Sequence, residues 1–212
     1  NHFIEIYWDA LFDYFEFEHR GEIQQSITVF ENEARTNAVH VGYNLRKILS
    51  KLAVSDLTII SHSLGARVVL STLCNTYDEL ATTEMKALPT PQQENIKIGL
   101  IAPAIGLQPF ESYFERTTSM DFTQRDNYQL SVMYNEADMV LLKKYGIIDL
   151  GSLKFGDTSL GCNYDAAAFK LKDYFSKNHP NSTLNLIEMK VGATHSIVHY
   201  AHSNEFLSFS EM

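Results

Sequence analysis

The chain has 212 residues, which suits one domain with a substantial core and is short for two. Hydrophobic residues make up 45% and charged residues 20%, and the formal net charge of −9 argues against a nucleic-acid binder and a polybasic membrane anchor. No apolar run approaches the ~20 residues that span a bilayer, so we expect no transmembrane segment.

Strand-like and helix-like segments alternate along the chain, which is typical of a parallel sheet covered by helices. A strand at residues 3–8 opens the chain abruptly, without a visible signal peptide, and leads us to expect further sequence upstream. The later predicted elements are a helix at 37–52, a strand at 57–60, a buried helix at 66–74, a surface connection at 82–95, strands at 96–102 and 130–134, a helix around 166–176, a strand at 184–189 and a helix at 197–206.

The two cysteines, Cys74 and Cys162, show no spacing typical of a metal or redox site and no disulfide framework. We predict Cys74 as a small core residue and Cys162 as a loop residue; a bridge between them has no support in the sequence. The low cysteine content favours a cytoplasmic protein, with an exported mature protein as the alternative.

The most informative segment is the turn Ser61-His62-Ser63-Leu64-Gly65, between a predicted strand and the buried helix. A nucleophile elbow, usually G-x-S-x-G, needs small residues two positions either side of its serine because larger side chains would collide with the strand and helix. Ser61 and Gly65 meet this need. The helix start beneath Ser63 favours negative charge, so we predict the Leu64 N–H as an oxyanion donor. The alternative is an ordinary turn with Ser61 or Ser63 as helix N-cap.

This elbow, with its β-branched strand and apolar helix, resembles that of the α/β-hydrolase superfamily, in the lipase- and esterase-like bacterial branch of unassigned substrate. The resemblance covers most of the chain. It implies an α/β-hydrolase fold in a single domain over 1–212, with a mostly parallel central sheet flanked by helices and the N-terminal strands missing. It also implies lid or pocket inserts at 104–127 and 139–175.

In that family the acid and then the histidine follow the serine along the chain. Asp138 comes just after the fourth predicted strand, with Glu136 as its nearest rival; a solvated turn or a helix N-cap is the alternative role for Asp138. His195 comes after the last predicted strand. His199 and His202 compete with it, although we expect the helix at their positions to carry them away.

The three C-terminal histidines, His195, His199 and His202, also fit one helix face at i, i+4 and i+7, which is a possible zinc site. The H-E-x-x-H pattern is absent, and we expect neither a metal nor a cofactor. We expect His62 to pack near the elbow.

Aromatic residues are frequent in the first predicted insert. They either line an acyl pocket or pack the insert onto the core, and the sequence leaves both open. These residues are Phe110, Tyr113, Phe114 and Phe122.

The resemblance implies a serine hydrolase that cleaves a carboxylic ester or thioester, a small-molecule acyl substrate. Ser63 would attack the carbonyl carbon, His195 would carry the proton, Asp138 would orient His195, and the Leu64 N–H would hold the oxyanion. The family's second oxyanion donor, on a loop after an earlier strand, is not visible here. That gap favours the alternative function, a catalytically inactive α/β-hydrolase module used for binding.

Overall fold

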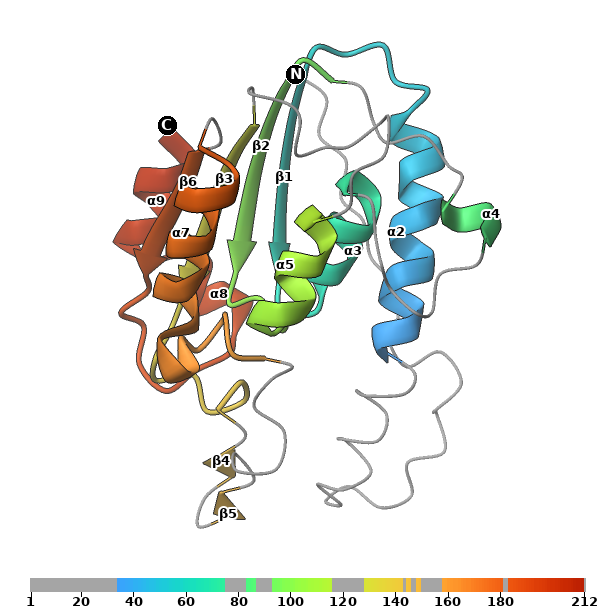
Figure 1. The fold of residues 1–212 in the computed structure, drawn as a ribbon. Coiled ribbons are helices and arrows are strands. Elements are labelled where there is room, and N and C mark those ends of the chain that lie inside the picture. Colours follow the sequence, from blue (N-terminus) through green and yellow to red (C-terminus); the bar gives the residue numbers. More distant parts are fainter. Residues whose placement is uncertain are drawn as a thin grey trace.

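The computed structural model describes residues 34–74, 83–86, 93–115, 128–142, 144–145, 148–149, 158–180 and 183–211. In these ranges the chain forms a four-stranded parallel sheet, in the order β1-β2-β3-β6, flanked by helices (Figure 1). Its strands are β1 (Asp56–His62), β2 (Asn95–Ile101), β3 (Tyr128–Tyr134) and β6 (Thr183–Glu188). A separate antiparallel pair joins β4 (Lys144–Tyr145) to β5 (Ile148–Asp149).

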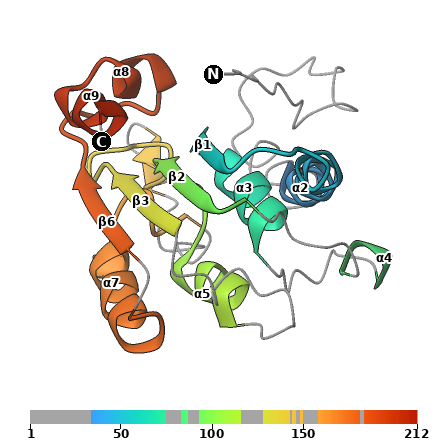
Figure 2. The ribbon, with the colours of Figure 1, turned by 90° about the horizontal axis from the view of Figure 1, so that it is seen from above.

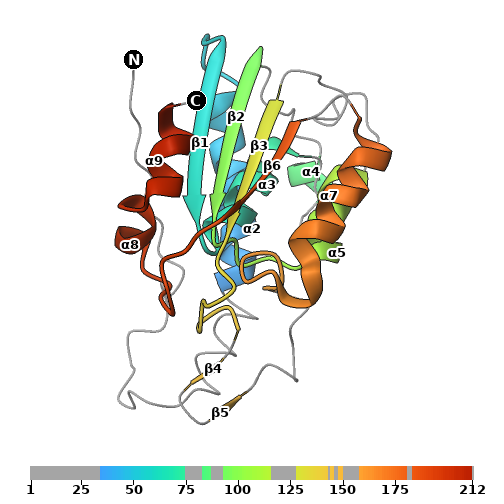
Figure 3. The same ribbon diagram turned by 90° about the vertical axis from the view of Figure 1, so that its left-hand side faces the viewer.

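Three helices connect neighbouring strands of the sheet: α3 (Gly65–Leu73), α5 (Leu107–Glu115) and α7 (Ala167–Asn178). The strands lie in the sheet in the same order as in the chain, so each crossover leads to the next strand in the same direction. Because crossovers between parallel strands are right-handed, all three helices then lie on one face of the sheet. Figure 2 shows this arrangement, with α2 (Arg35–Leu49) outside α3. The opposite face is covered by α8 (Ile197–Ala201) and α9 (Asn204–Glu211) (Figure 3). The short α4 (Thr83–Lys86) and a 3₁₀ turn, η4 (Tyr164–Ala166), lie in the connections.

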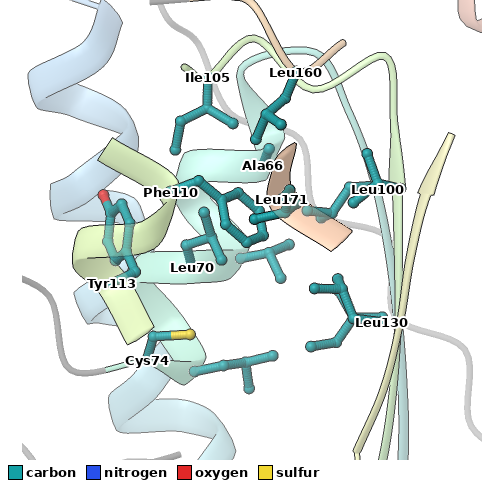
Figure 4. Packing of buried hydrophobic residues seen from close by; sticks show 14 of the residues in the cluster. Ala66, Leu70, Cys74, Leu100, Ile105, Phe110, Tyr113, Leu130, Leu160 and Leu171 are labelled. Carbon is teal, nitrogen blue, oxygen red and sulfur yellow. The ribbon is translucent and has the colours of Figure 1, made fainter. Parts of the chain in front are cut away.

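The main core lies between the sheet and the three crossover helices. Alternate strand residues such as Leu100 and Leu130 pack against Leu70 of α3, Phe110 of α5 and Leu171 of α7 (Figure 4). Every residue of α3 after its first glycine is buried. This position between α2 and the sheet explains why the α3 sequence is apolar nearly all round.

The other strand residues face α8 and α9. Ile101 and Met133 belong to a second buried cluster with Tyr200 and Phe209. A Cβ on Gly99 would lie 2.9 Å from two ring atoms of Phe209. The glycine in β2 therefore lets α9, which carries Phe209, approach the sheet closely.

Arg46 of α2 holds the last turn of α3. It is only 1% exposed, and its guanidinium donates to the carbonyl oxygens of Ser71, Thr72 and Cys74. These carbonyls belong to a helix end, where the last turn has no partners within the helix. Burial lowers the pKa of Arg46. A Cβ on Gly42 would lie 2.5 Å from the Ser71 Cβ, so the close contact of the two helices also requires glycine there.

The prediction of a parallel sheet covered by helices is confirmed for the described residues. The four predicted strands and three helices within them are found with ends shifted by no more than three residues; the helix expected at 37–52, for example, is α2. The strand predicted at 3–8 lies outside the described residues. Part of the connection predicted at 82–95 forms α4, and residues 87–92 lie outside.

The single helix predicted at 197–206 is wrong. The structure has two helices there, α8 and α9, separated at His202 and Ser203. The Ser203 hydroxyl accepts a hydrogen bond from the Phe206 N–H at 3.2 Å, so Ser203 caps the start of a new helix.

The predicted inserts at 104–127 and 139–175 are only partly described. Phe110 and Tyr113 of α5 are buried in the main core, which favours the packing role over the pocket role for these two. Phe122 and the side chain of Phe114 lie outside the described residues. None of the helices in the described ranges is long and apolar enough to cross a membrane.

Both cysteines are buried and free. Cys74 joins the main core as predicted. Cys162 lies in a turn, as predicted, and its thiol contacts the carbonyl oxygen of Thr158 at 3.5 Å.

Candidate active site

Three of the residues singled out in the sequence follow three different strands of the sheet. Ser63 comes directly after β1, Asp138 comes in the turn after β3, and His195 comes in the loop after β6. Because the carboxyl ends of parallel strands share one edge of a sheet, the three residues reach the same place from distant parts of the sequence.

Ser63 sits on a sharp turn between β1 and α3. Its φ of 54° lies in the left-handed region, which residues other than glycine rarely adopt. A Cβ on Gly65 would lie only 3.2 Å from the Ser61 Cβ, so the turn has room for small residues alone at these two positions. Leu64 precedes α3 with no side-chain cap, so the alternative of a serine N-cap is wrong.

Backbone hydrogen bonds join this turn to the end of β2. The Ser63 N–H donates to the Ile101 carbonyl at 2.9 Å, and the Ser63 carbonyl accepts from the Ala104 N–H at 3.0 Å. Ala102 between them also has a positive φ, 43°, and its N–H donates to the Met133 carbonyl of β3 at 2.7 Å. Residues 101–104 therefore fix the turn at Ser63 against the neighbouring strands.

The side chains of Ser63, His195 and Asp138 form one hydrogen-bonded line. His195 Nε2 lies 2.8 Å from Ser63 Oγ, and His195 Nδ1 lies 2.5 Å from Asp138 Oδ2. An ionised carboxylate can only accept, which assigns the proton of the neutral ring to Nδ1. Nε2 is then the acceptor, and the Ser63 hydroxyl donates to it.

Asp138 is fully buried. Its Oδ1 accepts the backbone N–H groups of Val140 at 3.0 Å and Leu141 at 3.1 Å, but residues 139–142 form a turn, so the helix N-cap considered from the sequence is wrong. Its Oδ2 faces His195, so one carboxylate binds both the turn and the histidine. The rival acid Glu136 accepts from the side chain of Asn163 at 2.7 Å.

Tyr200 and Asn135 are two functional candidates that the sequence reasoning missed. The Tyr200 hydroxyl donates to Asp138 Oδ2 at 2.8 Å, and Asn135 Nδ2 donates to the Tyr200 oxygen at 3.1 Å and to the Gly192 carbonyl at 2.8 Å. Asn135 thus ties the loop that carries His195 to the end of β3. No local pattern in the sequence marks either contact.

His62 packs beside the catalytic candidates, near the elbow as expected. Its ring centroid lies 4.6 Å from that of His195 and 5.7 Å from that of Tyr200. Burial, and then the nearby His195, lower the pKa of His62 to about 4, although Asp138 acts in the opposite direction. His62 is therefore neutral near pH 7, and adds no positive charge beside His195 when that ring takes up a proton.

His199 and His202, the two rivals of His195, do not contact Ser63 or Asp138. His199 Nδ1 lies 3.0 Å from Thr194 Oγ1, and His202 Nδ1 lies 2.7 Å from the Val198 carbonyl oxygen, both at exposed positions. His195 precedes α8, so the helix face required for a three-histidine metal site does not form. Across the described ranges, no cluster of three His, Cys, Asp or Glu side chains is arranged to hold a metal ion.

The predicted oxyanion donor, the Leu64 N–H, lies at the start of α3. The first amide groups of a helix have no acceptor within it and point toward a negative group placed there. The sequence left the second donor unassigned, and residues 1–33 and 116–127 lie outside the described ranges.

Comparisons of the chain with protein-family models, with curated proteins and with solved structures find no match.

Proposed function

We propose that this chain is a serine hydrolase of the α/β-hydrolase type, which cleaves carboxylic esters or thioesters through an acyl-enzyme at Ser63. The observation that carries the proposal is the line from Ser63 Oγ through His195 to Asp138, with contacts of 2.8 and 2.5 Å. A serine hydroxyl is a weak nucleophile until a base accepts its proton, and that base works best when a third group fixes its tautomer. The three side chains meet both conditions.

The chemistry follows from these contacts. Ser63 Oγ attacks the carbonyl carbon while its proton passes to His195 Nε2, and Asp138 stabilises the resulting imidazolium. The carbonyl oxygen becomes an oxyanion, which the Leu64 N–H stabilises. As the tetrahedral intermediate collapses, the bond to the leaving alcohol or thiol breaks and His195 returns the proton to it. Water, deprotonated by His195, then attacks the acyl-enzyme, releases the acid and restores Ser63.

Two features support the α/β-hydrolase type. The serine stands on a strained strand-to-helix turn, and the acid and histidine follow it in the order Ser, Asp, His on successive loops at the same sheet edge. Each feature alone occurs in other proteins; together they describe a nucleophile elbow with its two partners.

The test is intact-mass analysis after treatment with a fluorophosphonate, which phosphonylates activated serines with loss of fluoride. We expect a single adduct on the native chain and none on Ser63→Ala. Ser208→Ala is the matched control, because Ser208 is an exposed serine of α9 bonded to the Asn204 carbonyl, and it should label fully. Circular dichroism establishes that each variant is folded.

If the native chain takes the adduct, untreated native chain is then assayed with p-nitrophenyl esters of increasing acyl length, and untreated Ser63→Ala should be inactive on all of them. A folded native chain that takes no adduct would contradict the proposal. It would favour the alternative function, an inactive module that binds its ligand without turning it over.

A further inference from the structure

We propose that Tyr200 is a positioning residue of the triad: its hydroxyl donates to the Asp138 oxygen that also binds His195, and so sets how strongly that carboxylate holds the His195 proton. This inference deepens the proposed function and rests on it. It concerns the strength of the base, which the three catalytic candidates alone do not determine.

The geometry gives Tyr200 direct access to the carboxylate. Tyr200 is fully buried, and its hydroxyl lies 2.8 Å from Asp138 Oδ2. The same oxygen lies 2.5 Å from His195 Nδ1. Two donors therefore share one carboxylate oxygen, and each reduces the negative charge available to the other.

Asn135 settles which way the Tyr200 proton points. Its Nδ2, which can only donate, lies 3.1 Å from the Tyr200 oxygen, so that oxygen accepts from Asn135 and keeps its own proton for another partner. Two acceptors are within reach, Asp138 Oδ2 at 2.8 Å and the Thr194 carbonyl at 3.1 Å. The carboxylate is both closer and charged, so it takes the stronger hydrogen bond.

The donor keeps its proton over the working pH range. Burial is the main reason that the pKa of Tyr200 is raised, and Asp138 contributes in the same direction while Asn135 opposes it. The titratable groups that face this network are His62 from β1, His195 and Asp138 from the loops, and Cys162 from the turn before η4. Of these, His62 is already neutral near pH 7.

Removing the hydroxyl has a defined direction. In Tyr200→Phe the Asp138 oxygen loses one donor, so its charge acts more fully on His195 and stabilises the protonated ring. His195 should then lose its proton at a higher pH. A purely structural role would loosen the contact between His195 and Asp138 instead, which would lower the rate at every pH and move the midpoint down or leave it unchanged.

The first measurement is the pH dependence of the fluorophosphonate labelling rate. In Tyr200→Phe we expect the acid limb to move to higher pH by about half to one unit. This is less than the roughly 1–2 units that correspond to one hydrogen bond to a charged group, because Tyr200 acts on the ring only through Asp138. Tyr174→Phe is the matched control, because Tyr174 lies in α7 and its hydroxyl contacts His179 just after that helix rather than the site; its profile should match the native one.

The second measurement needs no activity. The ring of His195 is followed by NMR against pH in the Ser63→Ala chain, with and without Tyr200→Phe, and is assigned by its loss in His195→Gln. The midpoint should rise by the same amount as the acid limb. Replacement of Tyr200 by 3-fluorotyrosine, whose hydroxyl is a stronger donor, should move the midpoint to lower pH while keeping every contact.

These results separate the two proposals. A midpoint that stays fixed or moves down in Tyr200→Phe, or that fails to fall with 3-fluorotyrosine, overturns the role of Tyr200. A native chain that takes no adduct while the NMR midpoint moves as expected overturns the proposed hydrolase and leaves the Tyr200 effect on His195 established. If Tyr200→Phe does not fold, the 3-fluorotyrosine result decides alone.

Discussion

Ser61 and Gly65 face each other across the turn that carries Ser63, so closely that a Cβ on Gly65 would lie 3.2 Å from the Ser61 Cβ. A serine fits at position 61 because the residue opposite it has no side chain. The two positions are therefore coupled, and each limits what the other can be.

This coupling is testable by a double-mutant cycle. Gly65→Ala should lower the free energy of unfolding and slow labelling in the native background, but much less in a Ser61→Gly background, where the opposing Cβ is gone. The coupling energy should be about 1 kcal/mol. Urea unfolding and labelling rates measure it, and additive effects of the two changes would contradict the contact.

Variants of the proton relay should affect labelling unequally. Asp138→Asn leaves an amide beside His195 Nδ1 and favours the wrong tautomer, so the labelling rate should fall by about 10³- to 10⁴-fold. His195→Gln removes the base and should be at least as slow. His199→Gln is the matched control, because its ring contacts Thr194 and not the triad, and its rate should stay within about twofold of the native rate.

His62 should make folding stability depend on pH. Its pKa is about 4 in the folded chain against an ordinary value of 6.5, so only the unfolded chain protonates it between these pH values. Its contribution is fully present above pH 6.5 and is lost as the pH falls toward 4. His62→Phe keeps a ring beside His195 but cannot titrate, so its loss of stability between pH 7 and 4 should be smaller by about 3 kcal/mol.

Urea unfolding of the two proteins at several pH values in this window measures the difference directly. Parallel curves of unfolding free energy against pH for His62→Phe and the native chain would contradict the lowered pKa of the half-buried His62. Carboxylates distant from His62 affect both proteins equally and cancel in the comparison.

Arg46 should be essential for stability although it lies away from the candidate site. Arg46→Met keeps most of the side-chain volume but leaves the carbonyls of Ser71, Thr72 and Cys74 without their donor. We expect the free energy of unfolding to fall by about 3 kcal/mol. Lys47→Met, an exposed change on the same helix, should change it by less than about 0.5 kcal/mol. Equal effects of the two changes in thermal unfolding would contradict this role.

The parts of the candidate site that depend on residues close together in the sequence could be predicted from it. The elbow has a recognisable spacing because steric limits act on residues two positions from Ser63, and the acid and histidine follow strands whose periodicity is visible. Hydrogen bonds then join Ser63, His195 and Asp138 as the chain order implied. Their catalytic roles stay predictions until labelling is measured.

The rest depends on contacts between distant residues. Nothing near Tyr200 or Asn135 in the sequence marks their approach to Asp138, because that contact exists only once β3 and β6 are paired and α8 lies on the sheet. The break between α8 and α9 was missed for a related reason. The Ser203 cap competes with an apolar pattern that continues through it, and the buried position of Ser203 decides the outcome.

The end of β2 contributes no reactive group to the site, yet residues 101–104 bond to the backbone of Ser63 on one side and to Met133 of β3 on the other. For directed evolution of the proposed activity, mutational libraries should therefore spare 102–104. A change there would misalign Ser63 for every substrate alike.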